Sequence, residues 1–184
     1  ISGIPESNTM FYSFSSFTVP TQIWQHNLKT EESKIYFKPE LDINTEDYVT
    51  KQVFYESKDQ VKVPMFLVHK KGTKKDGNNP VFLYGYGGFN ASLTPRFNQS
   101  NMVWLENGGI YALANIRGGG EYGEKWHKQG MKLYKQNVFE DFINAAEHLV
   151  DKKYTNKNKI AIHGASNGGL LVGAVTNQRP DLFE

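Results

Sequence analysis

The stretch Gly164-Ala165-Ser166-Asn167-Gly168-Gly169 decides how this 184-residue chain is interpreted. It contains the pattern Gly-x-Ser-x-Gly, which places a nucleophilic serine on a sharp turn between a strand and a helix. The flanking sequence suits such a turn, because residues 159–163 (KIAIH) predict a strand and residues 170–175 (LLVGAV) predict the start of a helix. A glycine-rich turn without chemistry is the alternative, and the two flanking elements weigh against it.

Each residue around the serine has a physical task in such a turn. Gly164 and Gly168 allow two backbone segments to approach so closely that a Cβ atom would collide, while Ser166 is held in a strained conformation. The backbone N–H of Asn167 lies in the first turn of the following helix, where the helix dipole favours a developing oxyanion. We therefore predict Ser166 as the nucleophile and the Asn167 N–H as one donor of an oxyanion hole.

A second glycine-rich segment, residues 83–90 (LYGYGGFN), follows another predicted strand at 81–84. Hydrolases with this kind of elbow place their other oxyanion donor in the loop at that position. The hydroxyl group of Tyr86 can donate a hydrogen bond to developing negative charge without carrying a charge itself. Taken alone, Tyr86 is equally well explained as a packed aromatic residue; the surrounding glycines and the downstream elbow favour the oxyanion role.

Composition and periodicity predict an α/β fold class in two parts. The first part, residues 1–40, is rich in Ser, Thr and aromatic residues and predicts short antiparallel strands. The second part, residues 41–184, predicts a hairpin, then buried strands of a mostly parallel sheet alternating with helices. The predicted strands of this second part are 48–57, 61–70, 81–84, 110–114 and 159–163. A helix is predicted over 138–151, with Asp141 on its polar face.

Bulk properties exclude several classes of function. The 21 basic and 19 acidic residues give a formal charge of only +2, which does not favour nucleic acid or an anionic membrane as a partner. The chain has no cysteine, so disulfides, thiolate metal sites and cysteine nucleophiles are excluded. No apolar run approaches the roughly 18 residues that a membrane helix requires. The five histidines are scattered without ligand spacing, so we expect neither a metal nor another cofactor.

Three further features suggest functions and are weighed here. Residues 118–123 fit the dinucleotide pattern Gly-x-Gly-x-x-Gly, but residues 124–136 lack the apolar face of the helix that such a site needs. We interpret residues 117–123 as a structural loop near the active-site face. His163 precedes the elbow on its strand, where packing is a better explanation than proton transfer. The sequence leaves the role of His127 open.

A serine hydrolase of this kind carries its acid and then its histidine after the serine. Residues 167–184 contain Asp181 and Glu184 but no histidine. We therefore expect the chain to be a fragment of a longer polypeptide, the remainder of which supplies both groups beyond Glu184 and is its necessary partner. The alternative is that the isolated chain is a non-catalytic fragment or scaffold.

Four segments together closely resemble the prolyl oligopeptidase family of serine peptidases, over roughly residues 48–184. They are 83–90 (LYGYGGFN), 114–123 (ANIRGGGEYG), 166–171 (SNGGLL) and 177–183 (NQRPDLF). The resemblance implies a hydrolase that cleaves short proline-containing peptides after proline through an acyl-enzyme. It also implies a cytoplasmic location.

The same resemblance implies a partial α/β-hydrolase fold preceded by the last blade of a β-propeller. Residues 1–40 would be the end of the propeller. Residues 41–184 would be the N-terminal part of the catalytic segment, which stops after the elbow helix. In the family, the residues matching Tyr86 and the Asn167 N–H form the oxyanion hole. The residue matching Phe89 helps to line the proline pocket, where an aromatic wall suits a flat, apolar ring.

Overall fold

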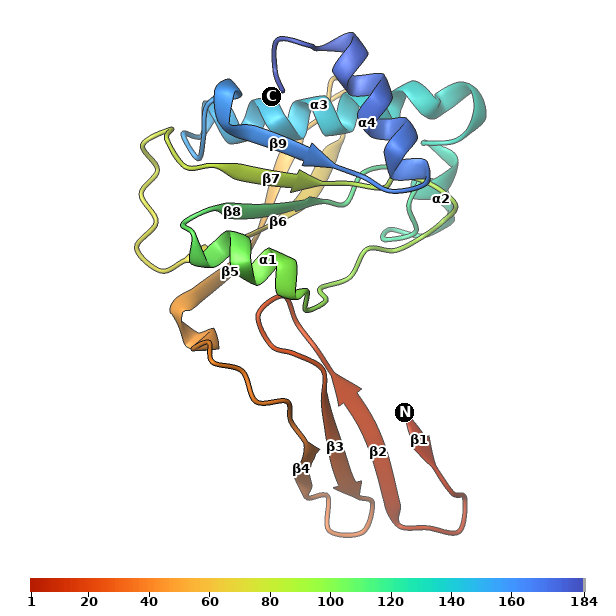
Figure 1. Ribbon diagram of the computed structural model, residues 1–184. Helices are drawn as coiled ribbons and strands as arrows, with labels where there is room; N and C mark the ends of the chain where they lie inside the picture. The colour runs from red at the N-terminus through yellow and green to blue at the C-terminus, as the bar shows by residue number, and fades with distance from the viewer. Residues whose placement is uncertain (184) are drawn as a thin grey trace. The chain divides into compact units, whose positions relative to one another are not determined.

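The computed structural model describes residues 1–183, which form two compact units with one β-sheet each (Figure 1). One unit comprises Ile1–Tyr48 and Pro95–Met102, and the other comprises Val49–Thr94 and Val103–Glu184. Glu184, one of the two acidic residues noted after the serine motif, lies outside the described residues. Over residues 1–183, no helix has the length and apolar character needed to cross a membrane. The chain is therefore a mixed α/β structure, as its sequence predicts.

The first unit contains an antiparallel sheet whose spatial order follows the chain order. Its strands are β1 (Ser2–Gly3), β2 (Thr9–Phe14), β3 (Gln22–Asn27) and β4 (Ser33–Phe37), followed by the short 3₁₀ helix η1 (Thr45–Asp47). Tyr12 stacks on its register partner Trp24, which supports the pairing of β2 with β3. The rings of Phe11 on β2 and Tyr36 on β4 also meet, in an edge-to-face contact. The antiparallel strands predicted for this region are confirmed.

The second unit contains a five-stranded sheet in the order β5-β6-β8-β7-β9. Its strands are β5 (Tyr48–Glu56), β6 (Lys62–Lys70), β7 (Val81–Tyr84), β8 (Ile110–Ala114) and β9 (Ile160–His163). β7 pairs in parallel with both β8 and β9, whereas β6 pairs antiparallel with β8. Every residue of β8 is buried, as expected for an inner strand covered on both faces.

The helices are partly as predicted. Their bounds are α1 (Gln99–Glu106), α2 (Glu124–Lys128), α3 (Lys135–Asp151) and α4 (Asn167–Gln178), with short 3₁₀ turns η2 (Lys132–Tyr134) and η3 (Lys157–Lys159). α3 begins at Lys135, three residues before the predicted start. α1 and α2 were not predicted, because α2 has only five residues and neither helix carries a strong apolar stripe.

Burial of α3 against the sheet forms most of the core of the second unit. Phe142 and Leu149 of α3 are fully buried together with Leu83 of β7 and Ala112 of β8. The carboxyl ends of β7, β8 and β9 lie at one edge of the sheet, because Tyr84 is in register with both Leu113 and His163. The loops that follow these three strands therefore emerge side by side.

A buried ionic cluster joins α3 to the sheet. Asp141 is completely buried and accepts hydrogen bonds from Arg117 at Nε (2.9 Å) and Nη2 (2.6 Å), and from the Ser57 hydroxyl (2.6 Å). The same guanidinium group also pairs with Asp59 at 2.5 Å, and Tyr55 donates to the Asp141 carbonyl oxygen. The polar, exposed position predicted for Asp141 is therefore wrong, since the charge of Arg117 makes its burial possible.

The pKa values follow from this pairing. Burial opposes the charge of Arg117, but the hydrogen bonds from its guanidinium group to Asp141 and Asp59 outweigh that effect and raise its pKa above the ordinary value. The hydrogen bond from Arg117 lowers the pKa of Asp59. Because the lowered pKa belongs to the folded state, this contribution of Asp59 to stability is present above its unfolded pKa. The contribution is lost as the pH falls through the lowered pKa of the folded state.

We expect Asp141→Ala to destabilise the protein by about 3 kcal/mol, because it leaves the buried Arg117 charge with only the half-exposed Asp59 as its charged partner. The denaturant midpoint of the intact protein measures this change. The matched control is Glu140→Ala, one position earlier on α3, whose partner Lys58 is largely exposed. The control should cost no more than about 1 kcal/mol, and equal losses in the two variants would contradict the central role of Asp141.

Candidate active site

Ser166 occupies a strand-to-helix turn of the predicted kind. β9 ends at His163, α4 begins at Asn167, and Ser166 between them has φ 56° and ψ −118°. This conformation is strained for a residue with a side chain, at a cost of about 1–3 kcal/mol. Ser166 is exposed, so its hydroxyl is open to a reactant. The strand, the turn and the helix required by the motif are all present.

Close backbone contacts explain the two motif glycines. A Cβ atom on Gly164 would overlap the carbonyl oxygen of Gly168, so this position accepts only glycine. A Cβ atom on Gly168 would lie 2.9 Å from the carbonyl oxygen of Gly85, at the start of the loop after β7. The close backbone approach predicted from the sequence is confirmed. Because neither glycine has a side chain, the elbow lies directly against the loop that carries Tyr86.

The loop after β7 has an unusual backbone. Gly87, Phe89 and Asn90 all have positive φ angles, of 62°, 54° and 56°. Two of these residues bear side chains, so other contacts must hold the loop in this shape. Tyr86 is half-buried in this loop and lies beside the elbow, since a Cβ atom on Gly168 would be 3.7 Å from its Cδ2 atom.

The side chain of Asn167 links the elbow helix to this loop. Its Nδ2 atom donates to the carbonyl oxygen of Tyr86 at 2.5 Å, and its Oδ1 atom accepts from Lys135 Nζ at 3.1 Å. Lys135 Nζ also donates to the carbonyl oxygen of Gly87 at 2.8 Å. The amide fills the space where a Cβ atom of Gly88 would stand. Asn167 therefore contributes a side-chain clamp in addition to the backbone N–H predicted from the sequence.

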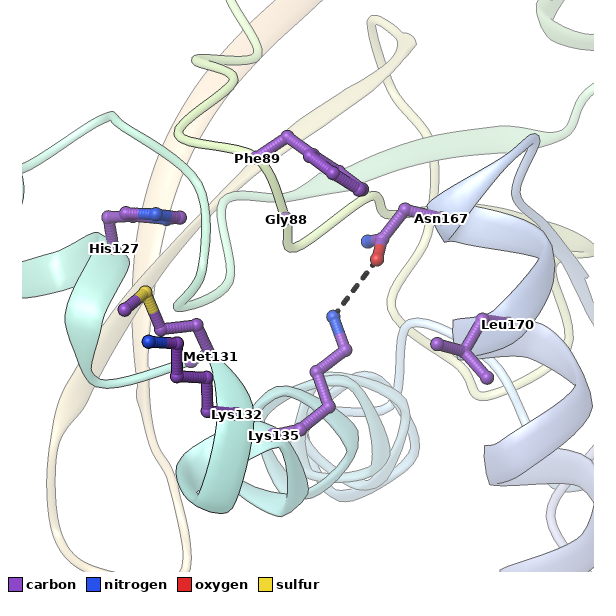
Figure 2. A pocket seen from close by; sticks show the side chains of 9 residues that line it. Gly88, Phe89, His127, Met131, Lys132, Lys135, Asn167 and Leu170 are labelled. Atoms are coloured by element: carbon purple, nitrogen blue, oxygen red, sulfur yellow. Dashed lines mark hydrogen bonds between the residues drawn. The ribbon is translucent and has the colours of Figure 1, made fainter.

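A hollow of about 600 Å³ opens beside this clamp (Figure 2). Its lining is mainly apolar, with two lysines and a histidine. The lining residues are Gly88, Phe89, His127, Gly130, Met131, Lys132, Lys135, Asn167 and Leu170. Figure 2 shows the Lys135 ammonium group directed at the Asn167 amide across this space. Burial lowers the pKa of Lys135 from its ordinary value, since the charged form is less well solvated there.

The structure brings the predicted site residues together to different degrees. Tyr86 and Asn167 are joined by a hydrogen bond, and Ser166 immediately precedes Asn167. Phe89 lies on the same loop as Tyr86 with 79% of its surface exposed, and it lines the hollow together with Asn167. All four residues thus belong to two segments in mutual contact at the carboxyl edge of the parallel strands.

The loop of residues 118–123 has a packing function in this arrangement. A Cβ atom on Gly118 would lie 2.5 Å from the carbonyl oxygen of Gly87, and one on Gly120 would lie 2.4 Å from the carbonyl oxygen of Asn90. The helix that follows, α2, has five residues and is too short to form a phosphate site. The interpretation of this segment as a structural loop near the site is confirmed.

Both histidines near the site have structural contacts. The ring of His163 packs against Phe82 and Tyr84 of β7, with centroid distances of 5.6 Å to each. His127 Nδ1 lies 2.7 Å from the carbonyl oxygen of Gly118, a distance at which the ring donates a hydrogen bond. His163 thus has the packing role expected from the sequence, and His127, whose role the sequence left open, holds the loop at Gly118.

Lys135 and Met131 are site residues that the sequence reasoning missed. Both precede the apolar stripe of α3, so the helical periodicity gave no reason to examine them. One signal was available for Lys135: a cation in the first turn of a helix opposes the helix dipole, which suggests a compensating contact. Over residues 1–183, no three His, Asp or Glu side chains are grouped so that they could hold a metal ion.

Comparison with known sequences identifies relatives for the whole chain. A profile of the Prolyl oligopeptidase family matches residues 95–184. The prolyl endopeptidase of Elizabethkingia meningoseptica is 55% identical over 173 residues, covering 94% of this chain and 24% of that protein. The prolyl endopeptidase of Dictyostelium discoideum is 49% identical over 179 residues, covering 95% of this chain and 24% of that protein. The chain thus spans about a quarter of the length of these curated relatives.

Solved structures give the same result. A structure from an analysis of two prolyl endopeptidases is 52% identical, with a TM-score of 0.94, covering 99% of this chain and 27% of that one. Prolyl oligopeptidase B from Galerina marginata, solved with a 35-residue peptide substrate, is 40% identical, with a TM-score of 0.89, covering 95% of this chain and 25% of that one. The identity over nearly its full length, and the agreement in fold, establish that the chain belongs to the prolyl oligopeptidase family.

Proposed function

We propose that the protein carrying this chain is a serine endopeptidase that hydrolyses short peptides on the carboxyl side of proline. The single observation that carries the proposal is the elbow at Ser166, with its strained backbone and exposed hydroxyl, pressed against the Tyr86 loop. Relatives named prolyl endopeptidase support the substrate class. In this proposal the intact protein is the enzyme, and the isolated chain is inactive.

The proposed reaction proceeds through an acyl-enzyme. The Ser166 Oγ atom attacks the carbonyl carbon of the proline residue while a histidine from the rest of the protein accepts its proton. The carbonyl oxygen becomes an oxyanion, which accepts hydrogen bonds from the Tyr86 hydroxyl and the Asn167 N–H. The histidine then protonates the leaving amine. In the second half, the histidine takes a proton from water, the water oxygen attacks the acyl carbonyl carbon, and the histidine returns a proton to Ser166 Oγ as the carboxylic acid leaves.

The N–H groups at the start of α4 support the proposed role of Asn167. The first N–H groups of a helix have no acceptor within the helix, and they lie at its positive end. Asn167 is the first residue of α4, and it directly follows the serine. An N–H group at this position can stabilise the oxyanion without a rearrangement of the backbone, which is the condition for efficient electrostatic catalysis.

Phe89 is proposed to form one wall of the proline pocket. Phe89 is 79% exposed on the loop that carries Tyr86, so a large apolar side chain is available to a ligand. A flat, apolar proline ring gains most from contact with such a face. The positive φ of Phe89 supports a functional reason for its conformation, because a bulky residue adopts it at a cost.

We further propose that the four-stranded unit is the last blade of a β-propeller and that the other unit is part of an α/β-hydrolase domain.

Three structures of the Galerina enzyme support a Ser-His-Asp mechanism for the family. In these structures a histidine, an aspartate or a serine is replaced by alanine and a peptide substrate is bound. The competing hypothesis, a scaffold without chemistry, offers no reason for the strained and exposed Ser166.

Ser166→Ala should abolish covalent labelling of the intact protein by a fluorophosphonate probe, because it removes the attacking oxygen. Binding of proline-containing peptides should persist, since the pocket is unchanged. Mass spectrometry of the labelled protein locates the adduct, and Ser13→Ala, in the four-stranded unit, is the control. Failure of the intact wild-type protein to react would sink the peptidase proposal, and stoichiometric labelling of the isolated chain would refute its inactivity.

Tyr86→Phe should lower kcat by about two orders of magnitude with little change in KM, because the lost hydrogen bond acts chiefly in the transition state. The matched control is Tyr84→Phe, two residues earlier, where the ring packs against His163. Steady-state kinetics with a prolyl peptide measures both variants. Unchanged turnover in Tyr86→Phe would remove this hydroxyl from the mechanism.

Phe89→Ala should lower kcat/KM for a prolyl peptide by about tenfold or more, since it removes an aromatic wall of the pocket. The loss should be smaller for the matching alanyl peptide, whose side chain makes less contact with the ring. Leu133→Ala, at another exposed apolar residue, serves as the control. Equal losses for the prolyl and alanyl substrates would show that Phe89 does not recognise proline.

A further inference from the structure

We propose that Lys135 is a positioning residue for the oxyanion hole, acting through the Asn167 side chain and the carbonyl oxygen of Gly87. This inference rests on the proposed function and assigns a task to a residue of α3, outside the serine motif. The two proposed donors, the Tyr86 hydroxyl and the Asn167 N–H, lie on different segments and must be kept at a fixed separation.

Lys135 forms a bridge between the loop after β7 and the elbow. A single ammonium group donates to Gly87 O at 2.8 Å and to Asn167 Oδ1 at 3.1 Å. Gly87 follows Tyr86 in the loop after β7, and Asn167 follows Ser166 in the elbow. Lys135 therefore connects the two segments that carry the proposed donors, from a helix that carries neither of them (Figure 2).

Lys135 also orients the Asn167 amide. Because Oδ1 accepts from the ammonium group, Nδ2 is directed at the carbonyl oxygen of Tyr86, to which it donates. Without the cation, the amide could rotate and place its oxygen against the Tyr86 carbonyl, where the two acceptors repel. Lys135 thus fixes a second connection between loop and elbow in addition to its own hydrogen bonds.

Both segments that Lys135 connects contain strained backbone. The loop has positive φ angles at Phe89 and Asn90, and the elbow has one at Ser166. Such conformations persist only when surrounding contacts over-determine them. Lys135 binds the loop next to its strained residues and the elbow next to Ser166, where it can resist relaxation of both.

The environment of Lys135 is unfavourable for its charge. Lys135 is the first residue of α3, a 17-residue helix with no acidic residue in its first turn, so the helix dipole opposes its charge. Burial also disfavours the charged form and lowers its pKa. The helix dipole and burial both disfavour a cation at this position. Its hydrogen bonds to the Gly87 carbonyl oxygen and to Asn167 Oδ1 give a reason for its presence.

The test uses Lys135→Met in the intact protein, which keeps the length and apolar stem of the side chain and removes its three donors. We expect kcat for a prolyl peptide to fall about 10–100-fold while KM changes less than about threefold, as for a misplacement of catalytic groups on the order of 1 Å. Affinity for a peptide aldehyde, which forms a tetrahedral adduct with the serine, should fall in the same proportion as kcat. Lys135→Arg, which keeps charge and donors, should recover part of the loss.

Lys128→Met on α2 is the matched control, because Lys128 is exposed and pairs only with Glu124 among the described ion pairs. It should leave kcat and aldehyde affinity unchanged. A merely structural lysine would lower the unfolding temperature and leave the kcat of the folded fraction intact. That result, or an unchanged kcat in Lys135→Met, overturns the proposal.

Asn167→Ala provides a second variant, because it removes the acceptor of Lys135 and keeps the backbone N–H. If Lys135 acts through this amide, the losses in the two single variants and the double variant should not multiply. Full multiplication overturns the proposal even if Lys135→Met is poorly folded. A wild-type protein that does not cleave prolyl peptides overturns the proposed function and this role together, whereas an active wild type with an equally active Lys135→Met variant overturns the role alone.

Discussion

Backbone contact among Gly85, Gly164 and Gly168 is the constraint on which the site depends. At these glycines no side chain separates the loop after β7 from the elbow, so the two segments touch there through main-chain atoms. Gly85 is enclosed from the other side as well, since a Cβ atom there would lie 2.7 Å from the ring of Phe142. Main-chain contact of this kind is short and stiff, and small shifts of one segment are transmitted to the other. The positions of Tyr86 and Asn167 are therefore coupled before any substrate is present.

Helix α3 supports this contact at two points along its length. Near its middle, Asp141 pairs with the buried Arg117 and ties the helix to the sheet and to the turn after β5. At its start, Lys135 reaches the loop and the elbow. The two interactions differ in character, because Arg117 and Asp141 are nearly inaccessible to water while Lys135 lines an open hollow. We infer that the middle of α3 secures the fold and that its first turn serves the site.

The sequence could predict features that depend on local pattern. The strands β7, β8 and β9 were recognisable as short apolar runs, and the elbow was recognisable from the spacing of Gly164, Ser166 and Gly168. The burial of Asp141 and the role of Lys135 could not be predicted in this way. Their partners lie 24 to 86 residues away along the chain, so only the folded structure brings them together. An interpretation from helical periodicity places every carboxylate on the solvent-facing side of a helix. It therefore placed Asp141 on the exposed face of α3, although this residue is buried.

The strained residues show how the stability of the second unit can serve chemistry. Ser166, Phe89 and Asn90 each adopt a conformation that an isolated peptide would avoid. Their cost is offset by interactions that lie outside the site, in the sheet pairing, the core under α3 and the Arg117 cluster. Because the strain is held in the folded state, the hydroxyl and its neighbouring N–H need little reorganisation when charge develops on a reactant. A rigid scaffold behind a strained turn is therefore the physical basis for proposing that Ser166 is catalytic, beyond the motif itself.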